Sequence, residues 1–299
     1  MTRLFDRPYL LLTLTALFWS GNMVVGRSIR GEVPPLGLAF WRWTLAFVLI
    51  LPFAWPHLRT QWTALKQGWR PIALLGALGV GGYNTFAYLA LQHTSAINAT
   101  MLNSLIPVAT ILLARVLLAR RLHRLEGIGV VLSLIGVSVI VSRGDLSSLL
   151  ALQLNPGDFW MLIAVLDWGL YTVALHWRPK GVDPMLMLAA MTVVGIAILA
   201  PLWAWELSNG HTIVLDIGNA LGIAYTAIFP GFLGYVFYNR GVSLVGPNRG
   251  SLFIHLMPAF GTVLSIVFLS ELPAAFHAVG IALILSGIWL TTRHTAEAR

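Results

Sequence analysis

The residues that could do chemistry in this sequence lie inside long apolar stretches, and several recur at matching positions. Trp19 and Trp168 each stand near the middle of such a stretch, and Asn22 and Tyr171 follow them by three residues. In a helix, this spacing places each pair on one face. Large rings at mid-depth could wall a cavity for a small molecule, or they could only pack helices together. We expect these four residues to line a substrate cavity.

A second group combines tyrosine and asparagine in two further stretches. Asn84 and Tyr88, which follow Tyr83, match Tyr235 and Asn239 when the chain is shifted by 151 residues, so the pair occurs twice in swapped order. Neutral hydrogen-bonding groups suit a zwitterion, and Tyr rings suit stacking or cation–π contacts. The same side chains could instead join neighbouring helices by hydrogen bonds. We include all five in the candidate cavity.

Ionisable residues within the apolar stretches are few. Ser251 and His255 could line the cavity, and a buried His can shuttle protons, although a neutral core His is as common. Asp167 is the acidic residue nearest the centre of a stretch; it could couple transport to protons, or pair with Arg42 or His255. Arg42 is expected to orient its helix or pair with a carboxylate, and direct contact with a substrate carboxylate is the alternative.

Composition restricts the class of protein. Hydrophobic residues make up 58% of the 299 residues and charged residues 10%, and the mean hydropathy is +0.80. Soluble domains carry about 25% charged residues, so this chain has too few for a water-facing surface. Ten apolar stretches are each long enough to cross a membrane as a helix. They are 9–30, 35–55, 71–91, 96–118, 124–142, 157–177, 184–205, 217–239, 245–269 and 273–292. Because they are long and continuous, we expect helices rather than a barrel.

The basic residues predict an orientation. If the N-terminus is cytoplasmic, 15 of the 19 Lys and Arg residues fall in cytoplasmic segments, and three fall in outside loops. This bias predicts that both termini are cytoplasmic in a bacterial inner membrane. It also explains the net charge of +8 without nucleic-acid binding. The basic start followed by an apolar run is interpreted as an uncleaved first span.

The chain also repeats itself. The superimposed pairs are Trp19 and Trp168, Pro35 and Pro184, and Pro52 and Pro201 at an offset of 149, and Pro107 and Pro258, Gly129 and Gly280, and Gly136 and Gly287 at an offset of 151. Residues 1–148 and 149–299 would then each hold five spans in one integrated domain. Because five is odd, the second unit enters the membrane from the opposite side, as in inverted-repeat transporters. Glycines and prolines cluster in the third and eighth spans and predict interrupted helices there. Pro107 and Pro258 are expected to kink the fourth and ninth spans similarly.

Two stretches carry a resemblance to a known family. LALQHTSAINATMLNSLIPVATILLARVLLARRL precedes GIGVVLSLIGVSVIV, and NRGVSLVGPNRGSLFIHLMPAFGTVLSIVFLSELP precedes VGIALILSGIWL. Their order, together with AFWRWTLAF, resembles the EamA family of the drug/metabolite transporter superfamily, and its YddG-type aromatic amino-acid exporters in particular. The resemblance implies ten helices around a central cavity. One departure is that Arg120 stands where the second half has the family's end-of-helix Glu271.

These features favour an exporter of neutral or aromatic amino acids or similar metabolites that works by alternating access. Multidrug efflux is the alternative within transporters, and a membrane-embedded enzyme or a channel is the alternative from another class. We expect no enzyme activity, because paired carboxylates and hydrolase or zinc motifs are missing. With no cysteine, a thiolate metal site is excluded, and we expect no metal or cofactor. The expected partners are a small-molecule substrate and the lipid bilayer, with the protein a monomer.

Overall fold

The computed structural model describes residues 5–119, 124–145, 155–245 and 253–297, and all regular structure within them is helical. Among these described residues, seven helices are long and apolar enough to cross a membrane, and three shorter apolar helices span Gly127–Val141, Phe253–Leu269 and Ala275–Leu290. The all-helical membrane architecture is thereby confirmed.

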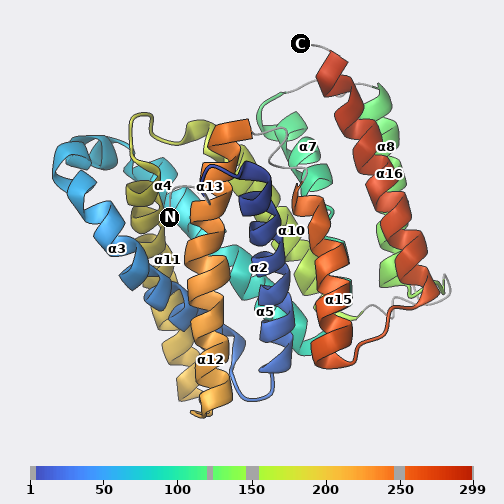
Figure 1. Cartoon of the computed structure of the whole chain (residues 1–299), viewed down its shortest axis with the longest axis horizontal. Helices are drawn as coiled ribbons and strands as arrows, with labels where there is room; N and C mark the ends of the chain where they lie inside the picture. Colours follow the sequence, from blue (N-terminus) through green and yellow to red (C-terminus); the bar gives the residue numbers. More distant parts are fainter. Residues whose placement is uncertain (1–4, 120–123, 146–154, 246–252, 298–299) are drawn as a thin grey trace.

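The helices of the first part of the chain are α2 (Pro8–Ser28), α3 (Pro35–Gln67), α4 (Trp69–Gly76), η1 (Ala77–Gly82), α5 (Tyr83–His93), α6 (Ala96–Asn103), α7 (Ile106–Leu117) and α8 (Arg124–Val141). Those of the second part are α10 (Pro156–Ala174), η2 (Leu175–Trp177), α11 (Pro184–Ser208), α12 (Ile217–Thr226), η3 (Ala227–Leu233), α13 (Gly234–Val245), η4 (Phe253–Leu256), α15 (Met257–Leu269) and α16 (Ala275–Glu297). In Figure 1, α2, α5 and α10 occupy the middle of the bundle.

Two helical spans are interrupted by π-helical segments. The first is η1 between α4 and α5, and the second is η3 between α12 and α13. The first contains Gly79, Gly81 and Gly82. The second contains Gly231 and Pro230, and Pro230 has no N–H to donate to the preceding turn. Such π segments widen a helix locally and often occur at functional sites. The sequence signal for broken helices in these spans therefore has a direct structural counterpart.

The two prolines expected to kink their spans instead begin new helices. Pro107 lies in the first turn of α7, after α6 has ended at Asn103, and Pro258 lies in the first turn of α15, directly after the 3₁₀ turn η4. The first turn tolerates proline because its N–H has no helical partner there. The sequence-based expectation of two simple kinks is corrected to two helix starts.

Helices α8 and α16 pack side by side at one edge of the bundle (Figure 1). Their backbones meet at glycines: a Cβ added at Gly136 would lie 2.7 Å from the carbonyl oxygen of Gly280. A Cβ at Gly287 would lie 2.3 Å from the carbonyl oxygen of Gly129. Small residues permit this close approach, which drives helix association in lipid.

We therefore expect Gly136→Leu to separate α8 from α16 and to destabilise the protein by about 1–3 kcal/mol, the usual range for overpacking. Thermal unfolding of the purified protein, followed by tryptophan fluorescence, measures the loss. Gly127→Leu in the same helix is the matched control, because a Cβ there meets nothing within 4 Å. Equal melting of the two variants would contradict the glycine contact.

Candidate functional site

The centre of the bundle is organised around a buried arginine. Arg42 of α3 is only 3% exposed, and its Nη1 lies 2.7 Å from Asn22 Oδ1, 2.6 Å from Asn84 Oδ1 and 2.8 Å from the Tyr88 hydroxyl. The Tyr88 hydroxyl also donates to Asn22 Oδ1 at 2.7 Å. This Arg42 cluster (Arg42, Asn22, Asn84, Tyr88) thus joins α2, α3 and α5. Three of the predicted cavity residues are brought together by one cation.

Aromatic rings form a second group beside it. The Trp168 ring of α10 lies 4.7 Å from the ring of Tyr83 and 4.8 Å from that of Tyr171, measured between centroids. The Tyr83 hydroxyl donates to Asn103 Oδ1 at 2.9 Å. A Cβ at Gly79 of η1 would lie 2.7 Å from the Tyr171 ring, so only glycine leaves room for that ring. The glycine-rich π segment therefore positions this part of the cluster.

The second half of the chain contributes a similar arrangement. Trp19 of α2 donates from Nε1 to the carbonyl oxygen of Pro230 at 3.3 Å, and its ring lies 6.2 Å from Tyr235. A Cβ at Gly234 would lie 2.8 Å from Trp19 Nε1. Tyr235 is in turn 5.9 Å from the Trp43 ring. A glycine beside η3 thus admits Trp19, as Gly79 in η1 admits Tyr171.

Ring contacts link Tyr235 to the arginine. Tyr235 contacts both Trp19 and Trp43, and Arg42 Cζ lies 5.2 Å from the centroid of the Trp43 ring. We call the rings of Trp19, Tyr83, Trp168, Tyr171 and Tyr235 the aromatic cluster. It comes from α2, α5, α10 and α13, and it lies against the Arg42 cluster. Rings with hydroxyl groups around a buried cation can hold a small amphipathic molecule with a negative end.

Three predicted cavity residues lie elsewhere. Asn239 is on an exposed side of α13, so it does not face the clusters as its counterpart Tyr88 does. His255 is half-buried in the 3₁₀ turn η4 and has no hydrogen bond to another described residue. Ser251 lies outside the residues that the structure describes. The swapped Asn/Tyr pairing in the sequence therefore does not carry over into matching positions in space.

Asp167 has a different neighbour from those considered in the sequence analysis. Its carboxylate lies against η1, where a Cβ at Gly82 would come within 2.4 Å of Oδ1, and the backbone N–H of Tyr83 donates to it. Its Oδ2 has no hydrogen-bond partner among the described residues. The suggested pairing with Arg42 or His255 is corrected to a backbone contact with the π segment.

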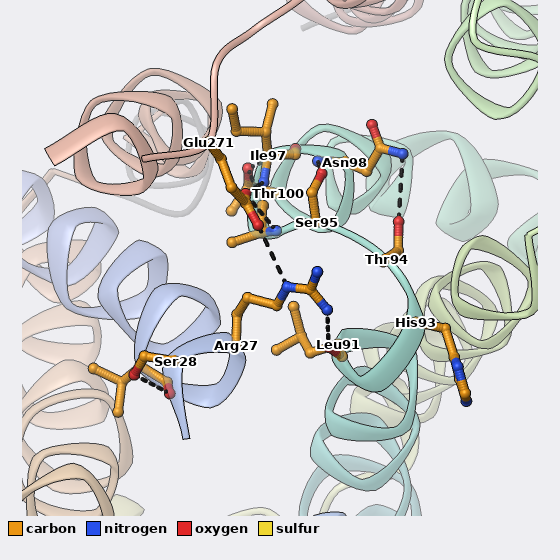
Figure 2. Close-up of polar contacts among 12 residues, drawn as sticks. Arg27, Ser28, Leu91, His93, Thr94, Ser95, Ile97, Asn98, Thr100 and Glu271 are labelled. Carbon is orange, nitrogen blue, oxygen red and sulfur yellow. Dashed lines mark hydrogen bonds and ion pairs between the residues drawn. The ribbon is translucent and has the colours of Figure 1, made fainter. Parts of the chain in front are cut away.

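A polar closure holds one end of the bundle (Figure 2). Glu271, in the loop after α15, accepts from the backbone N–H groups of Ala96 and Ile97 at 3.0 and 3.3 Å, and so caps α6. Its other oxygen lies 3.4 Å from Arg27 Nε, and Arg27 Nη1 donates to the carbonyl oxygen of Leu91 at 2.8 Å. Burial raises the pKa of Glu271, while the amides of Ile97 and Ala96 act in the opposite direction. We call these contacts the Glu271 closure.

A chain of buried side chains continues the closure across further helices. Thr94 donates to Asp158 of α10, Asn98 Nδ2 lies 3.4 Å from the same carboxylate, and Asn98 Oδ1 lies 2.8 Å from His277 Nε2. Because the backbone N–H of Ala274 donates to His277 Nδ1 at 2.8 Å, the proton of a neutral His277 is on Nε2. Sequence reasoning missed this chain, and no local pattern signals it.

Among the described residues, no group of three His, Cys, Asp or Glu side chains could hold a metal ion. The arrangement instead offers a cation, neutral hydrogen-bonding groups and rings deep in a helical bundle.

Comparisons with known proteins agree with this architecture. The chain is 25% identical to the Bacillus subtilis transporter YyaM over 94% of this chain and 92% of that protein. It is 27% identical to an Archaeoglobus fulgidus transporter over 96% and 98% of the two chains. It is 26% identical to a Streptantibioticus cattleyicolor protein named "Probable terminal-alkyne amino-acid exporter", over 96% and 94%.

A solved crystal structure shares the fold, with a TM-score of 0.64, 22% identity and 98% of each chain covered. The model of the EamA-like transporter family matches the sequence twice, over residues 7–142 and 155–293. These two matches cover nearly the whole chain, and the chain therefore belongs to the EamA-like transporter family.

Proposed function

We propose that the protein is a secondary transporter that exports neutral or aromatic amino acids, or similar small metabolites, by alternating access. The observation that carries this proposal is the aromatic cluster packed against a buried arginine that has only neutral partners. The amino-acid exporter among the relatives supports the substrate class. Multidrug efflux would be favoured by a cavity without a charged group, and Arg42 argues against it.

We further propose ten spans arranged as two inverted repeats, residues 1–148 and 149–299. The double match of the family model supports two units. The π segments also support them, since η1 and η3 begin 150 residues apart and end 151 residues apart. The seven membrane-length helices and three shorter apolar ones among the described residues support a count of ten spans. The bias of basic residues favours an inner-membrane protein with cytoplasmic termini, which turns the Glu271 closure toward the outside.

The direct test is flux into liposomes that contain the purified protein. Labelled neutral and aromatic amino acids are supplied with and without imposed ion gradients, and uptake is compared with that of empty liposomes. We expect protein-dependent uptake of at least one aromatic amino acid. Uptake at the level of empty liposomes for every amino acid would overturn the proposed substrate class.

Asp167 is the candidate for proton coupling, because its carboxylate is buried against η1 and Oδ2 has no hydrogen-bond partner among the described residues. Burying a carboxylate within a membrane helix costs free energy, and such residues commonly mark proton relays or substrate pathways. We expect Asp167→Asn to remove the dependence of flux on a pH gradient while leaving downhill exchange in place. Asp6→Asn, which changes an exposed carboxylate, is the control. Undiminished pH-driven flux in Asp167→Asn would rule out this role.

A further inference from the structure

We propose that Arg42 binds the carboxylate of the transported molecule through its unused edge, an inference that rests on the proposed transport function. A guanidinium has five N–H donors, two of them on Nη1. All three hydrogen bonds of Arg42 are made by Nη1. Nε is buried without a partner, and the hydrogen bonds of Arg42 to described residues do not include Nη2. Three of the five donors are therefore unused.

The positive charge of Arg42 also has no counter-ion among the described residues. Its partners Asn22, Asn84 and Tyr88 are neutral, and none of the ion pairs between described residues involves Arg42. A buried cation without a counter-ion is strongly unfavourable, because desolvation is not offset by any opposite charge. The carboxylate of Asp167 contacts the backbone of Tyr83 and does not supply this charge. A bound anion would supply the opposite charge.

The geometry favours a carboxylate. Nε and Nη2 lie on one edge of the planar guanidinium, which is an edge at which Arg binds a carboxylate through two parallel hydrogen bonds. The Nη1 contacts from α2 and α5 fix the plane of the group. Gly231 of η3 packs close to this edge: a Cβ added there would lie in ordinary contact with Nε, 3.8 Å away. Because the residue is glycine, no side chain of that residue covers the edge.

The residues around Arg42 indicate which kind of anion would bind there. Arg42 is a single cation within the two clusters, and a phosphate dianion would call for more positive charge than one guanidinium provides. The Trp43 ring lies beside the guanidinium, with its centroid 5.2 Å from Arg42 Cζ, and Tyr235 contacts Trp43. A monoanionic carboxylate attached to an aromatic or apolar body matches this combination. The inferred substrate class is therefore an aromatic carboxylic or amino acid.

Three probes of similar shape test the inference on the unaltered protein in lipid nanodiscs. L-phenylalanine and 3-phenylpropionate have the carboxylate, and phenethylamine lacks it. Binding is measured by calorimetric titration. We expect phenethylamine to bind on the order of 100-fold more weakly than phenylalanine, since a buried charge left unpaired costs that much. Equal binding of phenethylamine, or no binding of any probe, would overturn the inference.

Variants locate the effect at this residue. Arg42→Gln is expected to abolish the preference for the carboxylate probes, and Arg42→Lys to retain part of it, because Lys keeps the charge but not the two-bond edge. Arg240→Gln, at an exposed ion pair, should behave as the unaltered protein. If Arg42→Gln does not fold, the probe series on the unaltered protein still decides. A carboxylate preference without any flux in liposomes would contradict the proposed amino-acid transport but not the Arg42 inference.

Discussion

Glu271→Ala is expected to open the closed end of the bundle and to reduce transport by more than tenfold. The change removes the carboxylate oxygen that accepts from two amides at the start of α6, and it removes the counter-ion of Arg27. Loss of the cap and of a partly buried charge contact together costs about 2–3 kcal/mol. A shift of this size changes the ratio of closed to open molecules by roughly 30- to 150-fold. The cycle would then stall with that end open.

The absence of cysteine makes the measurement direct. A single cysteine at Ala99, which is fully buried in the second turn of α6, reports access from that side. We expect a membrane-impermeant maleimide to label it far faster in Glu271→Ala than in the parent. Glu271→Gln is the matched control, since it keeps an acceptor for the α6 amides and should have a smaller effect. Unchanged labelling in Glu271→Ala would show that other contacts hold this end closed.

Trp168→Ala is expected to raise the half-saturating concentration of aromatic substrates by about 30-fold, while the protein still folds. The Trp168 ring contacts both Tyr83 and Tyr171 and is only partly buried, so its loss removes a wall of the cluster rather than core packing. Removing an aromatic anchor of a binding site costs about 2 kcal/mol. Concentration-dependent uptake of labelled phenylalanine measures the shift.

Trp160→Ala on the same helix is the control. It stacks on Phe86 at 5.9 Å and lies eight residues from Trp168, about 12 Å along an α-helix. We expect uptake close to that of the parent protein. An equal loss in both variants would indicate a general effect on α10 and would count against the aromatic cluster as the site.

The Arg42 cluster and the Glu271 closure share two helices. Helix α2 carries Asn22 and Arg27, and α5 carries Tyr88 and Leu91. Asn22 is bonded to Tyr88 and Arg27 to Leu91, so the same pair of helices is joined at the site and at the closure. Arg42 Nη1 is bonded to both Asn22 and Tyr88, so an anion held at the other edge of Arg42 would act on the first join. This gives a physical route from substrate binding to opening of the closed end.

Much of the fold was predictable because it depends on local pattern. Continuous apolar stretches predict the helices, and clustered glycines with Pro230 predict where the spans are interrupted. Trp19 and Trp168 were singled out by mid-span position, and each contacts tyrosine rings: Trp19 that of Tyr235, and Trp168 those of Tyr83 and Tyr171. Two kinks were predicted where two helices begin, because a proline pattern does not distinguish a bend from a first turn.

The rest depends on contacts between distant segments. Arg27 and Glu271 are 244 residues apart, and no spacing rule connects them. The partners of Arg42 come from two other helices, so the sequence could offer only alternatives for its role. Asn239 matches Tyr88 in register but lies on an exposed side, because a repeat preserves the order of helices more closely than the direction of each side chain.

The central claim is one substrate site that opens to either side in turn. Exchange in liposomes tests it most directly: release of labelled phenylalanine is timed with and without unlabelled phenylalanine outside. We expect the unlabelled substrate to accelerate release several-fold, because a loaded carrier returns faster than an empty one. Release that is insensitive to outside substrate, or accompanied by ionic current, would contradict a carrier and favour a channel.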